Sequence, residues 1–102
     1  MIDKLKALGD ENRYSIIRLL LEKKHCVRAL ASKIGISEPA VSQHLKILKS
    51  CGLVTGHKSG YFMHYHVNKE ALGSVIDELS LLLTIEPTQE TENKKCCHGG
   101  EQ

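Results

Sequence analysis

The stretch VRALASKIGISEPAVSQHLKILKS, residues 27–50, decides the fold. Its first part has apolar residues at i, i+3, i+4 and i+7, which predicts a two-turn amphipathic helix over 27–34. Gly35 suits the left-handed position that ends a helix, and Ser37 suits the N-cap of the next one, with Pro39 in its first turn. A second helix is therefore expected from Ser37 to Ser50, and its buried stripe is Ala40, Val41, Leu45 and Leu48. Two helices joined by a tight turn are typical of helix-turn-helix DNA-binding motifs.

The sequence before this stretch predicts two more helices. Leu5 and Leu8 indicate a short one near the start of the chain. Asp10 is placed to cap a longer helix, in which apolar residues recur at helical spacing from Glu11 to about Lys24.

After the motif the apolar pattern changes to period two. Residues 53–55 and 61–67 are rich in β-formers, and His57–Gly60 is a basic, glycine-bearing link, so we expect a β-hairpin with a positive tip. A last helix begins near Asn68, and residues 84–102 form a polar tail that we expect to be flexible. The predicted fold is mainly α with a β-hairpin wing, in the order α-α-α-α-β-β-α, and residues 1–83 form one winged helix-turn-helix domain.

Charge is distributed unevenly along the chain. The 102 residues carry a formal net charge of +2, but residues 1–69 hold 12 Lys and Arg against 5 Asp and Glu, a balance of +7. Residues 70–102 hold 2 against 7, a balance of −5. A basic body favours a polyanionic partner, because Lys and Arg release counterions from phosphates, and for a helix-turn-helix that partner is double-stranded DNA. The alternative interpretation is scattered, solvated charge.

Other protein classes find little support in the sequence. It has no apolar run of the roughly 18 residues that a membrane span requires, and its start lacks the features of a signal peptide, so we expect a cytoplasmic protein with no membrane partner. In a reducing compartment its four cysteines are free thiols or metal ligands rather than disulfides. No phosphate loop, paired carboxylates or nucleophile-base spacing is present, so we expect no enzyme.

The polar face of the second motif helix has the chemistry for reading DNA. Gln43 can pair bidentately with adenine, serines can reach phosphates or base edges, and lysines suit phosphates. Lys58, with His57 beside it, offers a second contact from the wing. The alternatives are an ordinary solvated helix face and a charged, soluble turn. The predicted DNA-binding residues are Ser37, Ser42, Gln43, His44, Lys46, Lys49 and Lys58.

Three segments together resemble the ArsR/SmtB family of bacterial and archaeal repressors: LKALGDENRYSIIRLLL (5–21), LASKIGISEPAVSQHLKILKSCGLV (30–54) and GYFMHYHV (60–67). The resemblance covers roughly residues 2–83. It implies a homodimer formed by the first and last helices, and repression that ends when a metal ion or metalloid binds and weakens DNA affinity. The matching dimer residues in this sequence are Leu5, Leu8, Leu72, Val75, Ile76, Leu79 and Leu82.

The sequence departs from the family at its usual effector sites. The family's arsenic and cadmium box is Cys-Val-Cys, but this chain reads Cys26-Val27-Arg28, and residues 69–83 contain no His for the family's zinc site. What remains is a tail with Cys96, Cys97 and His98. Two thiolates suit As(III), Sb(III) or another thiophilic ion, with a third ligand from Cys51, Cys26 or the other subunit; His98 would serve zinc or copper. The alternative is a tail with incidental cysteines.

The leading hypothesis is therefore a dimeric repressor that a thiophilic metalloid or metal releases from its operator, with no cofactor required for DNA binding. A second hypothesis makes the input redox, through a disulfide or persulfide at Cys26 and Cys51. A third is a winged-helix protein-interaction module. Each of these cysteines can also be a small core residue. His64 and His66 share one strand face, where they face solvent or DNA or form a metal pair.

Overall fold

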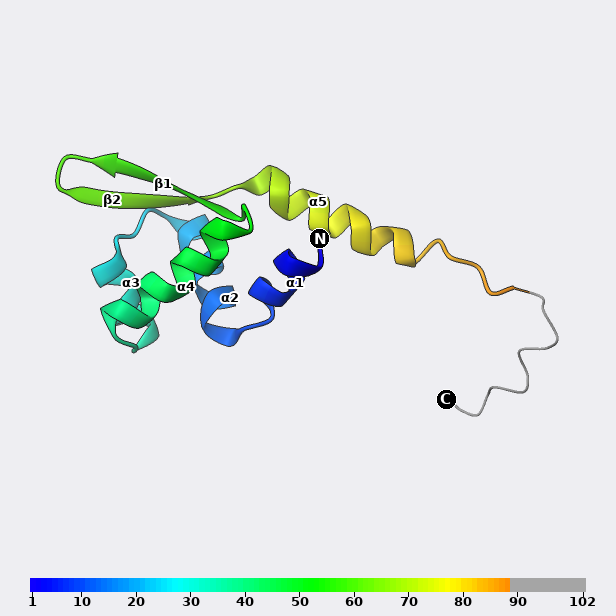
Figure 1. Cartoon of the computed structure of the whole chain (residues 1–102), viewed down its shortest axis with the longest axis horizontal. Coiled ribbons are helices and arrows are strands. Elements are labelled where there is room, and N and C mark those ends of the chain that lie inside the picture. The colour runs from blue at the N-terminus through cyan, green and yellow to red at the C-terminus, as the bar shows by residue number, and fades with distance from the viewer. Residues whose placement is uncertain (89–102) are drawn as a thin grey trace.

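The computed structural model describes residues 1–88 of the chain, and its elements follow the predicted order (Figure 1). Five helices and one two-stranded antiparallel sheet are present in this part. The fold class predicted from sequence, mainly helical with a β-hairpin wing, is thus confirmed. The elements are α1 (Ile2–Leu8), α2 (Glu11–Glu22), α3 (Val27–Ile34), α4 (Glu38–Ser50), β1 (Val54–Ser59), β2 (Phe62–Val67) and α5 (Lys69–Leu82).

The helix-turn-helix forms where its start and stop signals predict it. Gly35 ends α3 with φ +84°, the left-handed region that a side chain disfavours, and its N–H donates to the Ala31 carbonyl at 2.8 Å. Ser37 then caps α4, because its Oγ accepts the Ala40 N–H at 3.2 Å. Pro39 lies in the first turn, where its missing N–H costs nothing.

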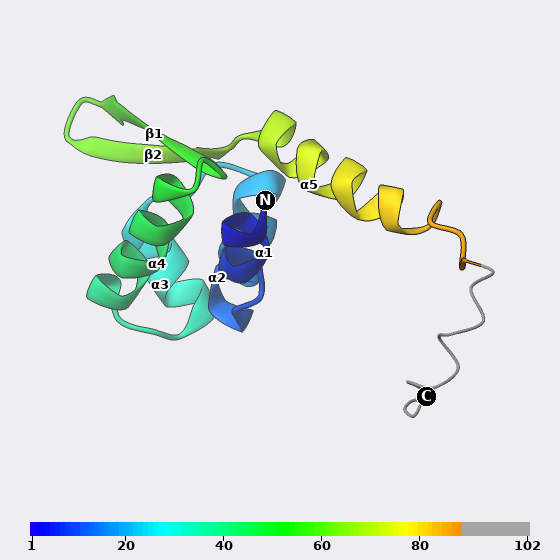
Figure 2. The ribbon, with the colours of Figure 1, turned by 45° about the vertical axis from the view of Figure 1, so that its right-hand side comes forward.

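The core lies between α2, α3, α4 and the base of the wing. Its fully buried side chains come from each of these elements, and α2 packs against α3, α4 and β2. Complete burial of one such side chain stabilises the fold by about 1.5–3 kcal/mol. This packing fixes α4 on the helical body with one side turned outward (Figure 2). The largest fully buried residues are Ile16, Leu30, Val41, Leu45, Leu48, Leu53 and Val54.

The wing is longer than the sequence suggested. The expected link His57–Gly60 is wrong, since His57, Lys58 and Ser59 belong to β1 and pair with residues of β2. Ser59 lies opposite Phe62, so the turn contains only two residues, and Gly60 takes φ +63° there. Two-residue hairpins need such a conformation at the first turn position, which explains why pairing reaches so close to the tip.

Helix α5 extends away from the helical body (Figures 1 and 2). Asn68 caps it, because its side-chain oxygen accepts the backbone N–H groups of Glu70 and Ala71 at 3.1 Å. Val75 is its one buried residue, whereas most other apolar side chains of the helix are exposed. Within residues 1–88 no helix combines the length and apolar character needed to cross a bilayer.

Candidate nucleic-acid interface

One side of α4 carries the predicted reading residues. Ser42, Gln43, Lys46 and Lys49 are all exposed, while Val41, Leu45 and Leu48 hold the opposite side of the helix in the core. Ser37 is exposed at the N-terminus of the same helix. The structure therefore brings five of the seven predicted residues to the outward side and the start of one helix. Hydroxyl, amide and ammonium groups in this arrangement can contact phosphates and base edges together.

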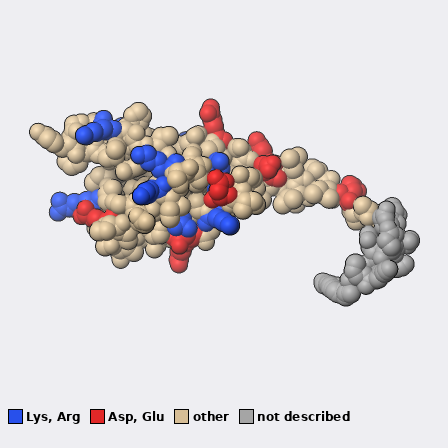
Figure 3. Space-filling view, viewed as in Figure 1, with Lys and Arg blue, Asp and Glu red and all other residues tan. Residues whose placement is uncertain are grey.

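Lys58 adds a cation from a second element. It is exposed on β1, opposite Met63 and next to the turn, rather than in the loop where the sequence placed it. In Figure 3, Lys and Arg side chains lie over the helical body, with some Asp and Glu among them, and on the wing, while the projecting part of α5 shows Asp and Glu. The uneven charge of the sequence is thus also uneven in space.

His44 differs from the other predicted residues, because it is anchored in the protein. Its side chain is only 19% exposed, and its Nδ1 lies 3.3 Å from Nη1 of Arg13 on α2. The Nε of Arg13 donates to the Ala7 carbonyl at the end of α1, at 2.7 Å. Sequence reasoning missed Arg13, since a contact between residues 31 positions apart leaves no local signal.

The carboxylate of Asp10 completes this cluster. It accepts the backbone N–H groups of Asn12 and Arg13 at 3.0 and 3.1 Å, so it caps α2 as predicted. The Arg13 N–H bond lowers the pKa of Asp10 below its ordinary value, and the charge of Arg13 acts in the same direction. The carboxylate therefore stays ionised beside the start of the helix, where a negative charge favours the dipole.

The histidines of the wing lie on the face of the hairpin that points away from the core. His57 is paired with His64 in the register, and the rings of His57 and His66 meet edge to face with centroids 5.4 Å apart. The Nδ1 of His64 is buried without a hydrogen-bond partner among the described residues. Within residues 1–88 no group of three His, Cys, Asp or Glu side chains is arranged to hold a metal ion.

The cysteines fall into two groups. Cys26 and Cys51 are free and half-buried; Cys26 precedes α3, and Cys51 ends α4 with its thiol donating to the Leu48 carbonyl at 3.4 Å. The predicted metal ligands Cys96 and Cys97, with His98, lie outside the described residues, as does most of the predicted tail.

An apolar groove of about 330 Å³ lies where α1, α2 and α5 meet. Leu8 and Leu72, both predicted for the dimer interface, line it together with Tyr14, Ile17 and Leu21, and the Arg18 side chain borders it. Leu5 is half-buried, and Val75 is already buried within the chain. The remaining predicted interface residues are exposed on α5, with Ile76 at 57%, Leu79 at 39% and Leu82 at 60%.

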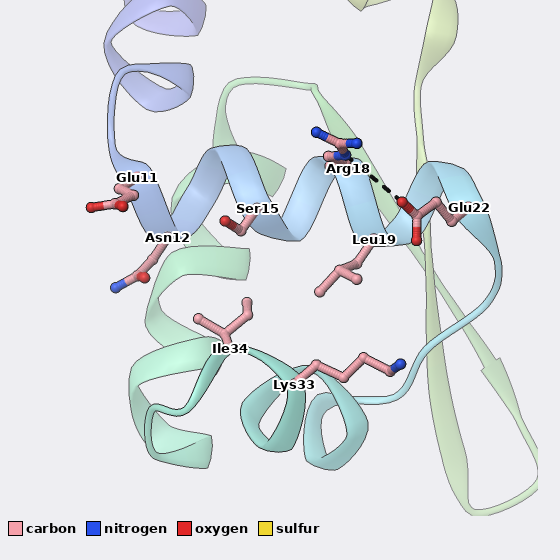
Figure 4. A pocket seen from close by; sticks show the side chains of 8 residues that line it. All are labelled: Glu11, Asn12, Ser15, Arg18, Leu19, Glu22, Lys33 and Ile34. Atoms are coloured by element: carbon pink, nitrogen blue, oxygen red, sulfur yellow. Dashed lines mark ion pairs between the residues drawn. The ribbon is translucent and has the colours of Figure 1, made fainter.

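A second, polar groove of about 410 Å³ runs between α2 and α3 (Figure 4). An ion pair at 3.7 Å between Arg18 and Glu22 lies along it, and Lys33 comes from the facing helix. Glu11, Asn12, Ser15, Leu19 and Ile34 complete the lining, which contains no Cys or His. None of the predicted DNA-binding residues lines this groove.

Comparison with known proteins gives one consistent answer. The model of a family described as "Bacterial regulatory protein, arsR family" matches residues 10–55. The HTH-type transcriptional repressor SmtB of Mycobacterium tuberculosis is 39% identical over 71% of this chain and 53% of its own length. The arsenical resistance operon repressor of Escherichia coli K12 is 35% identical over 76% of this chain and 69% of its own length.

Solved structures agree. An ArsR-like transcriptional regulator from Rhodococcus sp. RHA1 superposes with a TM-score of 0.77 and 28% identity, covering 81% of this chain and 76% of that one. Reduced HlyU from Vibrio cholerae superposes with a TM-score of 0.66 and 32% identity, over 79% of this chain and 85% of that one. The chain spans about half the length of the SmtB relative.

Proposed function

Because this chain belongs to the ArsR family of bacterial regulatory proteins, we propose that it is a dimeric transcriptional repressor that binds duplex DNA with α4 and the wing. The observation that carries this proposal is the outward side of α4, where Ser42, Gln43, Lys46 and Lys49 are exposed on a helix fixed by its buried face. Lys58 on the wing is a further exposed cation. A regulatory rather than catalytic role follows from this assignment, in keeping with relatives named as transcriptional regulators.

The proposal that the protein is a dimer rests on apolar surface that is left exposed within residues 1–88. The groove lined by Leu8, Tyr14 and Leu72 continues into the exposed apolar side chains of α5. An exposed apolar surface of this kind marks a site for an apolar partner. A second copy of the chain provides that partner, because in a twofold dimer the same surface of each copy covers the other. Two copies would present two α4 helices to one duplex, as dimeric helix-turn-helix proteins do.

We propose further that a thiophilic metalloid or metal ion, such as arsenite, binds cysteines and weakens DNA binding. Cys96 and Cys97 supply two thiolates, and Cys51 or Cys26 is the candidate third ligand, with His98 as the alternative for zinc or copper. A ligand bound at Cys51 would act directly on α4, because Cys51 ends this helix and its thiol donates to the Leu48 carbonyl.

The DNA part is tested by fluorescence anisotropy with a labelled duplex taken from upstream of the protein's own gene. We expect affinity to fall steeply with salt, because each phosphate contact contributes about −0.9 to the slope of log K against log salt. Lys46→Gln should reduce that slope by about 1. Binding with no salt dependence would instead favour a protein-interaction module.

The effector part is tested by adding arsenite, antimonite, zinc or copper to the preformed complex. We expect at least one of these ions to release the DNA, and the Cys96→Ser, Cys97→Ser double variant to lose that response. Unchanged release by every ion in the double variant would overturn the assignment of the tail cysteines.

A redox input is the second candidate, favoured by the position of Cys51 at the end of α4. In this case an oxidant or a persulfide donor releases the DNA, and a Cys26→Ser, Cys51→Ser variant is insensitive to it. A normal oxidant response in that variant would exclude the redox candidate.

A further inference from the structure

Arg13 links three helices through one side chain. It lies in α2, its Nε donates to the Ala7 carbonyl in α1 at 2.7 Å, and its Nη1 lies 3.3 Å from Nδ1 of His44 in α4. The guanidinium is planar and rigid, so these two contacts fix its position jointly. The side chain therefore connects the first helix directly to the reading helix.

This contact determines which tautomer the neutral His44 ring adopts. A guanidinium has donors and no acceptor, so Nδ1 of His44 must accept the bond from Arg13. The neutral imidazole then carries its proton on Nε2. The nearest carboxylate oxygen, of Asp10, is 4.0 Å from Nδ1, which is beyond hydrogen-bond distance and does not compete with Arg13.

The Nε2 atom faces away from this anchored side of the ring. Only His25 Nε2 and His64 Nδ1 are buried without a partner among the side-chain nitrogen and oxygen atoms of residues 1–88. No hydrogen bond from that range to His44 Nε2 is present, and the atom is not among the buried ones, so it keeps some exposure to solvent. His44 directly follows Gln43 in α4, and Gln43 is one of the exposed residues of the outward side.

We propose that Arg13 is a positioning residue that fixes His44 as an Nε2–H donor to DNA. The acceptor is an oxygen or nitrogen of the duplex, either on a phosphate or on a base edge. This proposal rests on the proposed DNA-binding function and deepens it, because it adds a residue outside the helix-turn-helix to the reading machinery.

The tautomer is tested without DNA. Side-chain nitrogen chemical shifts of uniformly ¹⁵N-labelled protein distinguish a protonated from an unprotonated ring nitrogen. We expect His44 of the wild-type protein to be protonated on Nε2, and Arg13→Lys to shift the population toward the other tautomer, since Lys does not reproduce the planar fork. A wild-type His44 protonated on Nδ1 would overturn the proposal, whether or not any variant folds.

The DNA contact is tested by anisotropy on the operator duplex and on a random duplex. We expect Arg13→Lys and His44→Phe each to weaken operator binding roughly tenfold, the size of one hydrogen bond to a charged group. Arg13→Lys should change affinity less than about twofold once His44→Phe is present, because both variants remove the same contact. Independent, multiplying losses would overturn the positioning role.

The two duplexes identify the acceptor. Equal losses on both duplexes indicate a phosphate oxygen, and a loss confined to the operator indicates a base edge. Lys33→Gln, which removes a charge in the α2–α3 groove, is the electrostatic control and should change affinity less than about twofold. A wild-type protein that binds neither duplex overturns the proposed function and the DNA contact with it, whereas the nitrogen shifts test the Arg13–His44 contact separately.

Discussion

Helices α4 and α5 are similar in length, 13 and 14 residues, but they differ in how far their apolar side chains are buried. In α4, Val41, Leu45 and Leu48 are buried and the outward side is polar. In α5 only Val75 is buried, and Ile76, Leu79 and Leu82 remain exposed. Helix α4 buries its apolar residues within the chain, so its outward side is free to bind a polar partner such as DNA. Helix α5 needs an apolar partner that residues 1–88 do not supply.

A Leu→Ala change should therefore have its largest effect on folding in α4. Leu45 is 2% exposed, so Leu45→Ala leaves a cavity in the core and should lower the free energy of unfolding by about 2–5 kcal/mol. Urea denaturation followed by circular dichroism measures this loss. A loss below about 1 kcal/mol would mean that α4 is not held by its buried face.

The same change in α5 should act on association instead. Leu79 is 39% exposed, and Leu79→Ala removes surface that we propose is covered only in the dimer, at a cost of about 1–2 kcal/mol in each subunit. Sedimentation at several concentrations should show a dissociation constant raised at least tenfold. Leu81→Ala is the control, since Leu81 is 60% exposed on the other side of α5 and should leave it unchanged. Equal effects of the two variants would contradict the proposed interface.

Two Gly→Ala changes, one before α4 and one within α5, should change the stability of the fold in opposite directions. An added Cβ meets no atom within 4 Å at Gly35 or at Gly73, so packing does not distinguish them. Gly35 before α4 has φ +84°, where Ala costs about 1–2 kcal/mol. Gly73 lies within α5, where Ala favours the helix by about 0.5–1 kcal/mol. Thermal unfolding of both variants measures the signs, and a destabilising Gly73→Ala would indicate that the partner chain packs against that position.

The sequence predicted most of α4 and its surroundings because the relevant signals are local. Gly35, Ser37 and the apolar spacing of 40–48 each act within a few residues, and the structure places the motif where they indicate. The predicted extent of the wing was wrong, because Lys58 and the neighbouring Gly60 suggested a loop, whereas residues 57–59 pair with β2 up to a two-residue turn. Arg13 was missed for a related reason, since its partners Ala7 and His44 are brought together only by the packed fold.

The helix caps allow a finer, pH-dependent version of the same comparison. Asp10 and Asn68 each accept two backbone N–H groups, but only Asp10 titrates. Its pKa is lowered below the ordinary 3.8, chiefly by the Arg13 N–H bond, so its contribution to stability is present above that pH and is lost as the pH falls through the lowered pKa. The stability difference between wild type and Asp10→Asn should therefore shrink from pH ~5 to pH ~3. In an Asn68→Asp variant the stability contributed by the cap of α5 should depend on pH in the same way, because a carboxylate would then cap the start of α5 as well as the start of α2. Denaturation at each pH measures both effects. A wild type that keeps its full advantage over Asp10→Asn at the lowest pH would show that the Asp10 cap does not depend on its charge.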